Sequence, residues 1–244
     1  MNLLTAQEKI RSAGAIAVLT GAGISAESGI PTFRDAQTGY WARFSAHELA
    51  SPQAYSRDSK LVWDWYAERF ETCSSAQPNA AHLALAKLEQ RQNLTLATQN
   101  VDRLHQRAGS QNVLELHGNI VTARCESCQA VQPLEPKFRP PPTCQKCGSR
   151  MRPNVVWFGE NLPRQILEQA RTAFERCDVA LVIGTSSLVE PAASLGRMAK
   201  QAGAFLLEVN PEITPLSRYA DFRVSSGAVA GLAACINQST STHS

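Results

Sequence analysis

The sequence predicts an α/β protein built on a mostly parallel sheet with helices on both faces. Six short apolar runs of strand length recur along the 244 residues, and several end in polar residues or glycine. Between them lie segments with apolar residues at three- and four-residue spacing, which is typical of helices. Strands that alternate with helices favour a parallel sheet covered on both faces, because parallel neighbours need a crossover connection.

The expected strands are, in chain order, 15–20, 94–98, 112–116, 179–183, 205–209 and 221–224. The expected helices are 79–90, 163–177 and 192–203. In the first of these helices, Ala80, Leu83, Ala84 and Leu88 carry the helical spacing. Ligands of such sheets bind outside the carboxyl ends of the strands, and the unusual residues of this sequence follow those ends.

Two stretches interrupt the alternation and predict a smaller second lobe. Residues 36–75 are rich in aromatic residues and look helical, and residues 120–153 hold six prolines, which exclude long helices and central strands there. The main domain is therefore expected to combine 1–35, 76–119 and 154–244.

Composition excludes several classes of protein. The apolar fraction of 43% and the charged fraction of 18% are those of an ordinary globular chain, and the net charge of +3 does not suggest a polyanion-binding protein. The longest apolar runs are too short for a membrane span, and the first residues lack the pattern of a signal peptide. We therefore expect a cytoplasmic protein without membrane partners. We also expect a monomer.

Four of the seven cysteines lie within 23 residues, at Cys125, Cys128, Cys144 and Cys147. Two Cys-x2-Cys pairs separated by fifteen residues match a structural four-thiolate zinc site. Four protein ligands close the coordination shell, so this zinc is expected to be structural and not catalytic. The other three, Cys73, Cys177 and Cys235, are expected to be buried as small apolar residues.

A glycine loop follows the first expected strand. Gly21-Ala22-Gly23-Ile24-Ser25-Ala26 fits the G-x-G-x-x-A form, in which the glycines allow a sharp turn and the approach of a pyrophosphate, and the small last residue allows close helix–strand packing. This motif favours a Rossmann-like, dinucleotide-binding domain. The acidic residue that usually follows about 20 positions later, at the end of the second strand, is missing.

Longer motifs continue in order along the chain. GAGISAESGIPTFRD starts at Gly21, TQNVDRLHQRAG at Thr98 and ELHGN at Glu115; after the cysteines come VVWFGE from Val155, GTSS from Gly184 and EVNPE from Glu208. Together they closely resemble the sirtuins, the NAD-dependent protein-lysine deacylases, from about residue 10 to 230.

The resemblance implies which residues bind NAD as a co-substrate. The cofactor loops would comprise Gly21, Ala22, Gly23, Ser25, Ala26, Phe33, Arg34, Asp35, Gln99, Asn100, Asp102, Gly184, Thr185, Ser186, Asn210 and Ala228. Among these, Phe33 would shield the nicotinamide ribose. Asn210 would hold the adenosine ribose in place of the missing acidic residue, and Ala228 would line the adenine.

His117 is the expected general base, since a neutral imidazole can accept a proton near neutral pH. By the resemblance, it would activate a ribose hydroxyl, and the products would be free lysine, nicotinamide and an O-acyl-ADP-ribose. His105 is the strongest competing histidine.

Other residues are expected to bind the acylated-lysine protein or peptide substrate. Val155–Glu160, with Val156, Phe158, Gly159 and Glu160, would form an edge that pairs with the extended peptide. Tyr66 and Arg69, in the insertion 36–75, share a helix face and resemble the pocket of the class III subclass, which removes succinyl and malonyl groups. An arginine fork and a tyrosine hydroxyl suit an acyl chain that ends in a carboxylate.

Two alternatives remain open. The same fold could serve a general lysine deacetylase or an ADP-ribosyltransferase. A non-enzymatic zinc ribbon could instead bind nucleic acid through the basic residues of the cysteine module, Arg124, Lys137, Arg139, Lys146, Arg150 and Arg152. We expect these residues to form a solvated face or to contact substrate proteins.

Overall fold

A computed structural model describes residues 2–32, 44–138 and 140–236 of the chain. Among these residues, no helix combines the length and the apolar character that a membrane span requires.

The larger lobe is built on the predicted parallel sheet. Its strands are β1 (Ile16–Thr20), β2 (Leu94–Thr98), β3 (Val113–Glu115), β7 (Val179–Ile183), β8 (Phe205–Val209) and β9 (Phe222–Val224), and they pair in the order β3-β2-β1-β7-β8-β9. Every neighbouring pair is parallel. All residues of β1, β7 and β8 are buried, which explains why these strands read as continuous apolar runs and not as alternating ones.

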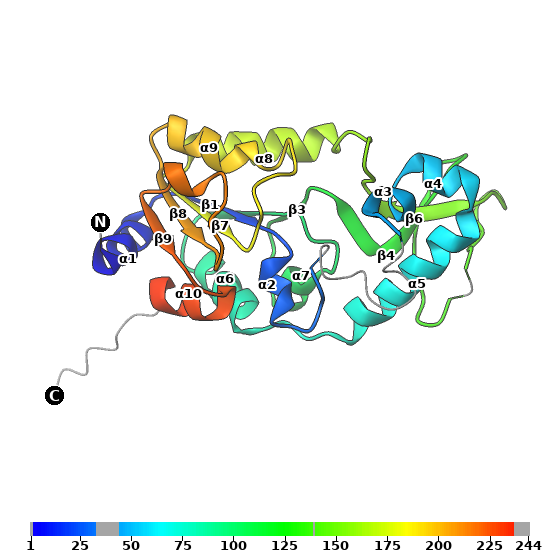
Figure 1. Cartoon of the computed structure of the whole chain (residues 1–244), viewed down its shortest axis with the longest axis horizontal. Helices are drawn as coiled ribbons and strands as arrows, with labels where there is room; N and C mark the ends of the chain where they lie inside the picture. The colour runs from blue at the N-terminus through cyan, green and yellow to red at the C-terminus, as the bar shows by residue number, and fades with distance from the viewer. Residues whose placement is uncertain (1, 33–43, 139, 237–244) are drawn as a thin grey trace.

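Helices cover both faces of the sheet (Figure 1). One face packs against α1 (Leu3–Ser12), α6 (Ala80–Glu89) and α10 (Ala228–Ile236), and the other packs against α8 (Arg164–Arg176) and α9 (Ser194–Gln201). Each face has its own apolar core, and the sheet separates the two. The α/β class and the Rossmann-like arrangement predicted from the sequence are confirmed.

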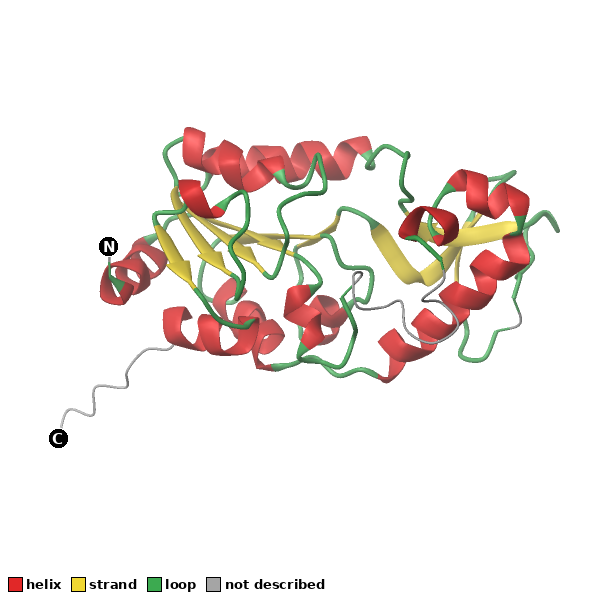
Figure 2. Cartoon of the chain, viewed as in Figure 1, coloured by secondary structure: helices red, strands yellow, loops and turns green. Residues whose placement is uncertain are grey.

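The smaller lobe combines the two interruptions of the pattern (Figure 2). Helices α3 (Ala46–Leu49), α4 (Pro52–Arg57) and α5 (Ser59–Ser75) pack against an antiparallel sheet of order β5-β4-β6, formed by β4 (Gly118–Cys125), β5 (Val131–Pro133) and β6 (Met151–Val155). A third apolar core joins the helices to the sheet.

The prolines of this lobe lie where the sheet tolerates them. Pro133 is in β5 and Pro153 is in β6, which are the two edge strands, whereas the central strand β4 contains no proline. The sheet starts at Gly118 and ends at Val155, so it extends two residues beyond each end of the predicted module 120–153.

Candidate functional site

The direction of the strand order reverses between β1 and β7, and the loops that follow these two strands meet there. In an open parallel sheet, the crevice at such a switch point is where ligands bind. Gly21 donates its N–H to the carbonyl of Ile183 at 3.0 Å, and Gly23 donates to the carbonyl of Gly184 at 2.8 Å. The two glycine-containing loops are therefore joined by backbone hydrogen bonds.

The glycines of these loops are required by backbone contact. A Cβ atom at Gly23 would lie 2.7 Å from the Cα atom of Gly184, and one at Gly21 would lie 2.7 Å from the Gly184 carbonyl oxygen. Gly184 itself has a φ of +60°, in the left-handed region that favours glycine. Gly23 thus leaves the space that the backbone of Gly184 occupies. Any space that it leaves for a phosphate is additional.

The helix that opens after the loop is short, because α2 spans only Gly23–Ala26. The N–H groups of Gly29 and Ile30 bond back to the carbonyls of Ala26 and Ser25, and Gly29 has a φ of +82°, as in a Schellman cap. Ala26 is exposed, so our expectation that it packs against the strand was wrong. In a single turn, Ile24 and Ser25 are the residues that face inward.

Backbone donors at the two loops remain available to a ligand. Among the described residues, the N–H groups of Ala22, Thr185 and Ser186 make no backbone hydrogen bond. Unpaired backbone amides of this kind, after the ends of the neighbouring strands β1 and β7, suit the oxygens of a phosphate.

A buried carboxylate lies beneath the first loop. Asp102 accepts a hydrogen bond from the Ser25 hydroxyl and another from the Leu104 N–H, both at 2.8 Å. The Asn100 amide donates to the Ser25 hydroxyl and to the Gly21 carbonyl, each at 3.1 Å. Burial raises the pKa of Asp102, and its two hydrogen bonds oppose that shift. Three of the predicted cofactor residues therefore form one connected polar cluster with the glycine loop.

Gln99 connects the second strand to both the β7 loop and His117. Its side-chain amide donates to the Thr185 hydroxyl at 2.8 Å, and its backbone carbonyl lies 3.0 Å from Nδ1 of His117. A carbonyl only accepts, so Nδ1 carries the proton and Nε2 is left with its lone pair. Burial lowers the pKa of His117, partly offset by the Gln99 carbonyl. The imidazole is therefore held neutral, with one basic nitrogen.

His105, the competing histidine, is placed differently. It is 1% exposed, its Nε2 is 2.9 Å from the Thr20 hydroxyl, and its ring packs 4.8 Å from that of His82. Burial lowers the pKa of His105 to about 3 and that of His82 to about 4. Both are neutral core residues that no solvent-borne substrate can reach.

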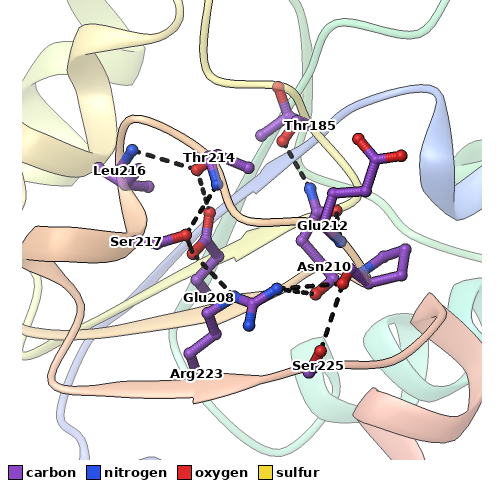
Figure 3. A network of polar contacts seen from close by, with 10 residues as sticks. Thr185, Glu208, Asn210, Glu212, Thr214, Leu216, Ser217, Arg223 and Ser225 are labelled. Carbon is purple, nitrogen blue, oxygen red and sulfur yellow. Dashed lines mark hydrogen bonds and ion pairs between the residues drawn. The ribbon is translucent and has the colours of Figure 1, made fainter.

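The loop after β8 carries Asn210 (Figure 3). Its side-chain amide donates to the Thr185 carbonyl at 2.8 Å, and its side-chain oxygen accepts the N–H of Glu212 at 3.0 Å. Asn210 therefore connects the β8 loop to the β7 loop. Half of its hydrogen-bonding capacity is left for a ligand.

Glu208, which we did not select from the sequence, anchors this loop from within β8 (Figure 3). It is 1% exposed and accepts hydrogen bonds from the hydroxyls of Thr214 and Ser217, the latter at 2.5 Å. Arg223 lies 3.7 Å from the same carboxylate and donates to the Asn210 carbonyl at 3.0 Å. The available signal was a glutamate inside an otherwise apolar strand.

Ala228 begins α10, and its side chain is buried in the core below the sheet. Any contact with an adenine would therefore use its backbone. Nearby, the Glu27 carboxylate accepts the N–H of Val229 at 2.9 Å, so a carboxylate of the chain itself already caps this helix. Phe33, Arg34 and Asp35, which were predicted to bind the cofactor, lie outside the described residues.

Tyr66 and Arg69 lie one turn apart on α5, which runs along the smaller lobe toward the junction with the larger one (Figure 1). The Tyr66 hydroxyl accepts the indole N–H of Trp157 at 3.0 Å. The Arg69 guanidinium lies 4.9 Å from the centre of the Trp65 ring. Burial raises the pKa of Tyr66 and of Asp102, and the Arg69 charge opposes both shifts.

The segment predicted as a substrate edge is not a strand beyond Val155, because its amides are used within the chain. Val156 donates to the His117 carbonyl at 2.9 Å and Phe158 to the Ala50 carbonyl at 2.9 Å. Gly159 turns the chain with a φ of +86°. A peptide that lies along this segment would therefore form hydrogen bonds mainly with the carbonyl groups of the segment and with the turn at Gly159.

The Glu160 side chain, predicted to contact substrate, is bound inside the lobe. Arg152, 8% exposed, contacts both Glu160 carboxylate oxygens, at 2.6 and 2.9 Å, and the N–H of Trp157 donates to the same carboxylate at 2.9 Å. These hydrogen bonds and the Arg152 charge lower the pKa of Glu160 against the effect of burial. Glu160 thus shapes the turn and does not extend toward a peptide.

The four clustered cysteines converge as predicted. Their ligand atoms all lie within 4.8 Å of one another, and three of the Sγ–Sγ distances are 3.5, 3.5 and 3.6 Å. Four sulfurs about 2.3 Å from a tetrahedral zinc would be about 3.8 Å apart, whereas a disulfide needs about 2.05 Å. Gly148 follows the second pair with a φ of +72°. The cluster fits a structural zinc that holds the smaller lobe.

The remaining thiols and the basic residues have ordinary structural roles. Cys73, Cys177 and Cys235 are buried, and burial raises the pKa of each to about 11. Arg150 pairs with Glu126 at 2.5 Å, and Arg152 is buried against Glu160. Arg139 lies outside the described residues. The basic face that a nucleic-acid-binding ribbon needs is therefore reduced to Arg124, Lys137 and Lys146 among the described residues of that set.

The switch point of the parallel sheet, the paired glycine loops beside it and the separate lobe with the cysteine cluster are those of a dinucleotide-binding protein of two lobes. Residues 21–191 match the sequence profile of the Sir2 family. An NAD-dependent protein deacylase of Thermus thermophilus is 54% identical over 233 residues, covering 93% of this chain and 91% of the relative. One from Archaeoglobus fulgidus is 52% identical over 216 residues, covering 87% of this chain and 88% of the relative.

Solved structures agree with these relatives. A Sir2 homologue in complex with NAD has a TM-score of 0.90 at 48% identity, covering 94% of this chain and 90% of the other. A Sir2 protein bound to an acetylated peptide has a TM-score of 0.85 at 33% identity, covering 95% and 96%. The chain belongs to the Sir2 family.

Proposed function

We propose that this NAD-dependent protein deacylase of the Sir2 family removes succinyl and malonyl groups from lysine side chains in preference to acetyl groups. The observation that carries the proposal is the placement of Tyr66 and Arg69 on one face of α5, beside the Trp157 turn that is bonded to His117. A guanidinium fork and a hydroxyl donor together recognise a carboxylate. An acetyl chain has no carboxylate and would accept none of these charge-assisted hydrogen bonds, so it would gain less from the pocket.

NAD supplies the acceptor for the acyl group and releases nicotinamide. The loops at Gly21–Ala26 and Gly184–Ser186 would hold its phosphates and riboses, and Gln99, Asn100 and Asp102 would hold the nicotinamide side. His117 would act as the general base through Nε2, because its Nδ1 proton is fixed on the Gln99 carbonyl. Asn210 would bind the adenosine ribose with its remaining hydrogen-bonding capacity.

The test is one turnover series with a single peptide that carries succinyl-, malonyl- or acetyl-lysine, followed by mass detection with and without NAD. We expect kcat/KM to be higher for the two acidic acyl groups. Arg69→Met should lower it for those two by about 100-fold, as the loss of charge-assisted hydrogen bonds implies, and leave the acetyl peptide nearly unchanged.

Arg57→Met is the matched control, since Arg57 is an exposed arginine of the same lobe. Comparable efficiency on acetyl and succinyl peptides, in both the wild type and Arg69→Met, would refute the acidic preference and favour a general deacetylase. Mass added to the protein as ADP-ribose would instead indicate an ADP-ribosyltransferase.

A further inference from the structure

We propose that Trp157 is a positioning residue for acyl specificity: its indole N–H holds the Tyr66 hydroxyl oxygen, so that the one Tyr66 proton is directed to the carboxylate of an acidic acyl group. The proposal rests on the proposed preference for succinyl and malonyl groups. It assigns to the Trp157 turn a role in choosing the acyl chain, in addition to any contact with the peptide.

The hydrogen-bond chemistry of the pair leaves one arrangement. An indole N–H can only donate, and a tyrosine hydroxyl has one proton and two lone pairs. At 3.0 Å, Trp157 therefore occupies a lone pair of the Tyr66 oxygen. Trp157 is the one hydrogen-bond partner of that hydroxyl among the described residues, so none of them accepts its proton. A carboxylate, which only accepts, is the complementary ligand.

The indole is held so that it cannot turn away from Tyr66. Its ring lies 3.5 Å below the Arg152 guanidinium and 5.1 Å from the Tyr55 ring, and Trp157 is 3% exposed. Arg152 is itself held by two contacts with the Glu160 carboxylate, which also accepts the backbone N–H of Trp157. Glu160 therefore helps to hold the indole in place, which gives its contacts inside the lobe a role.

The same turn connects the acyl pocket to the reacting end of the site. Val156, next to Trp157, donates to the carbonyl of His117 at 2.9 Å. Burial raises the pKa of Tyr66 to about 12, so the hydroxyl keeps its proton at neutral pH. The Tyr66 hydroxyl, the donor for the acyl carboxylate, is thus held at a set position relative to His117, the general base.

The experiment compares Trp157→Phe with the wild type on succinyl- and acetyl-lysine versions of one peptide. Phenylalanine keeps the aromatic body and removes the N–H. We expect kcat/KM for the succinyl peptide to fall about tenfold, mainly through KM, while the acetyl peptide changes by less than about twofold. In a Tyr66→Phe background, Trp157→Phe should have no further selective effect.

Trp63→Phe is the matched control. Trp63 is also buried in this lobe and donates its indole N–H at 2.9 Å, but to the carbonyl of Met151, which the Tyr55 hydroxyl also contacts. This variant should lower the melting temperature without changing the ratio of succinyl to acetyl efficiency. If Trp157→Phe does not fold, Glu160→Gln, which weakens the Arg152 clamp, is expected to change the same ratio in the same direction.

Equal losses on both peptides in Trp157→Phe, or a full selective loss that persists in the Tyr66→Phe background, would overturn the proposal while the acidic preference of the wild type stands. A wild type without that preference would refute the proposed function itself, and the role of Trp157 with it. The wild-type ratio therefore separates the two failures.

Discussion

Gly23→Ala should force the β1 and β7 loops apart and weaken NAD binding. The added Cβ atom would lie 2.7 Å from the Gly184 Cα atom and 2.8 Å from its carbonyl oxygen, whereas ordinary contact begins near 3.4 Å. The loops would have to separate by about 0.7 Å. Because both obstacles are backbone atoms, no side-chain rotation can relieve the contact.

The expected cost has two parts. Overpacking of this kind destabilises a protein by about 1–3 kcal/mol. In a chain of this length, each kcal/mol lowers the melting temperature by about 2–4 °C. A shift of the phosphate-facing amides that approaches 1 Å is also expected to reduce kcat/KM for NAD by as much as about 100-fold.

The assay is calorimetric titration of NAD into each variant, with a melting curve and the dependence of the rate on NAD concentration. Gly196→Ala is the control, because a Cβ atom there meets only the side-chain ends of Leu216 and Val182, at 3.0 Å, on α9. If Gly23→Ala binds NAD and melts like Gly196→Ala, the backbone contact between the loops is not what the glycines serve.

Three other predictions follow from the same structure. His82 and His105 have folded-state pKa values lowered to about 4 and about 3, so the unfolded chain binds more protons below its own pKa near 6.5. The free energy of unfolding should therefore be fully retained above pH 6.5 and fall by up to about 1.4 kcal/mol per pH unit for each histidine between pH 6 and 4. Urea unfolding at several pH values measures this dependence. If the free energy of unfolding of His105→Gln falls with pH as steeply as that of the wild type, the prediction is contradicted. Chelation or Cys144→Ser should release one zinc per chain and unfold the smaller lobe first, measured by metal analysis and melting, and a chain that melts identically without zinc would refute the structural role. Glu208→Gln should raise KM for NAD several-fold but leave KM for the acyl peptide unchanged, and an effect on both alike would indicate general destabilisation.

Much of the fold was predictable because its signals are local. The buried strands of a sheet covered on both faces are continuous apolar runs. Both ends of every predicted strand of this sheet agree with those of the observed strand to within two residues. The zinc site was equally accessible, since two Cys-x2-Cys pairs place sulfurs by short-range geometry.

Some expectations failed where local pattern and tertiary packing disagree. Ala26 was expected to face the strand, but a one-turn helix leaves it exposed. Glu160 stays a predicted substrate residue, but the buried Arg152 binds its carboxylate, so a contact with the peptide would use its backbone. Residues 155–160 were expected to form an edge for the peptide, yet three of their amides already bond to His117, Ala50 and Glu160.

By itself, the sequence determined the order of the elements, the Sir2 motifs, the metal-binding quartet and the candidate base His117. Only the tertiary structure decided how those groups act, because the deciding contacts join residues far apart in the chain. The Gln99 carbonyl selects the tautomer of His117, Glu208 anchors the loop of Asn210, and Trp157 donates a hydrogen bond to a hydroxyl 91 residues away. Hydrogen bonds are directional and short, so no periodicity or spacing along the chain encodes them until the fold brings their partners within about 3 Å.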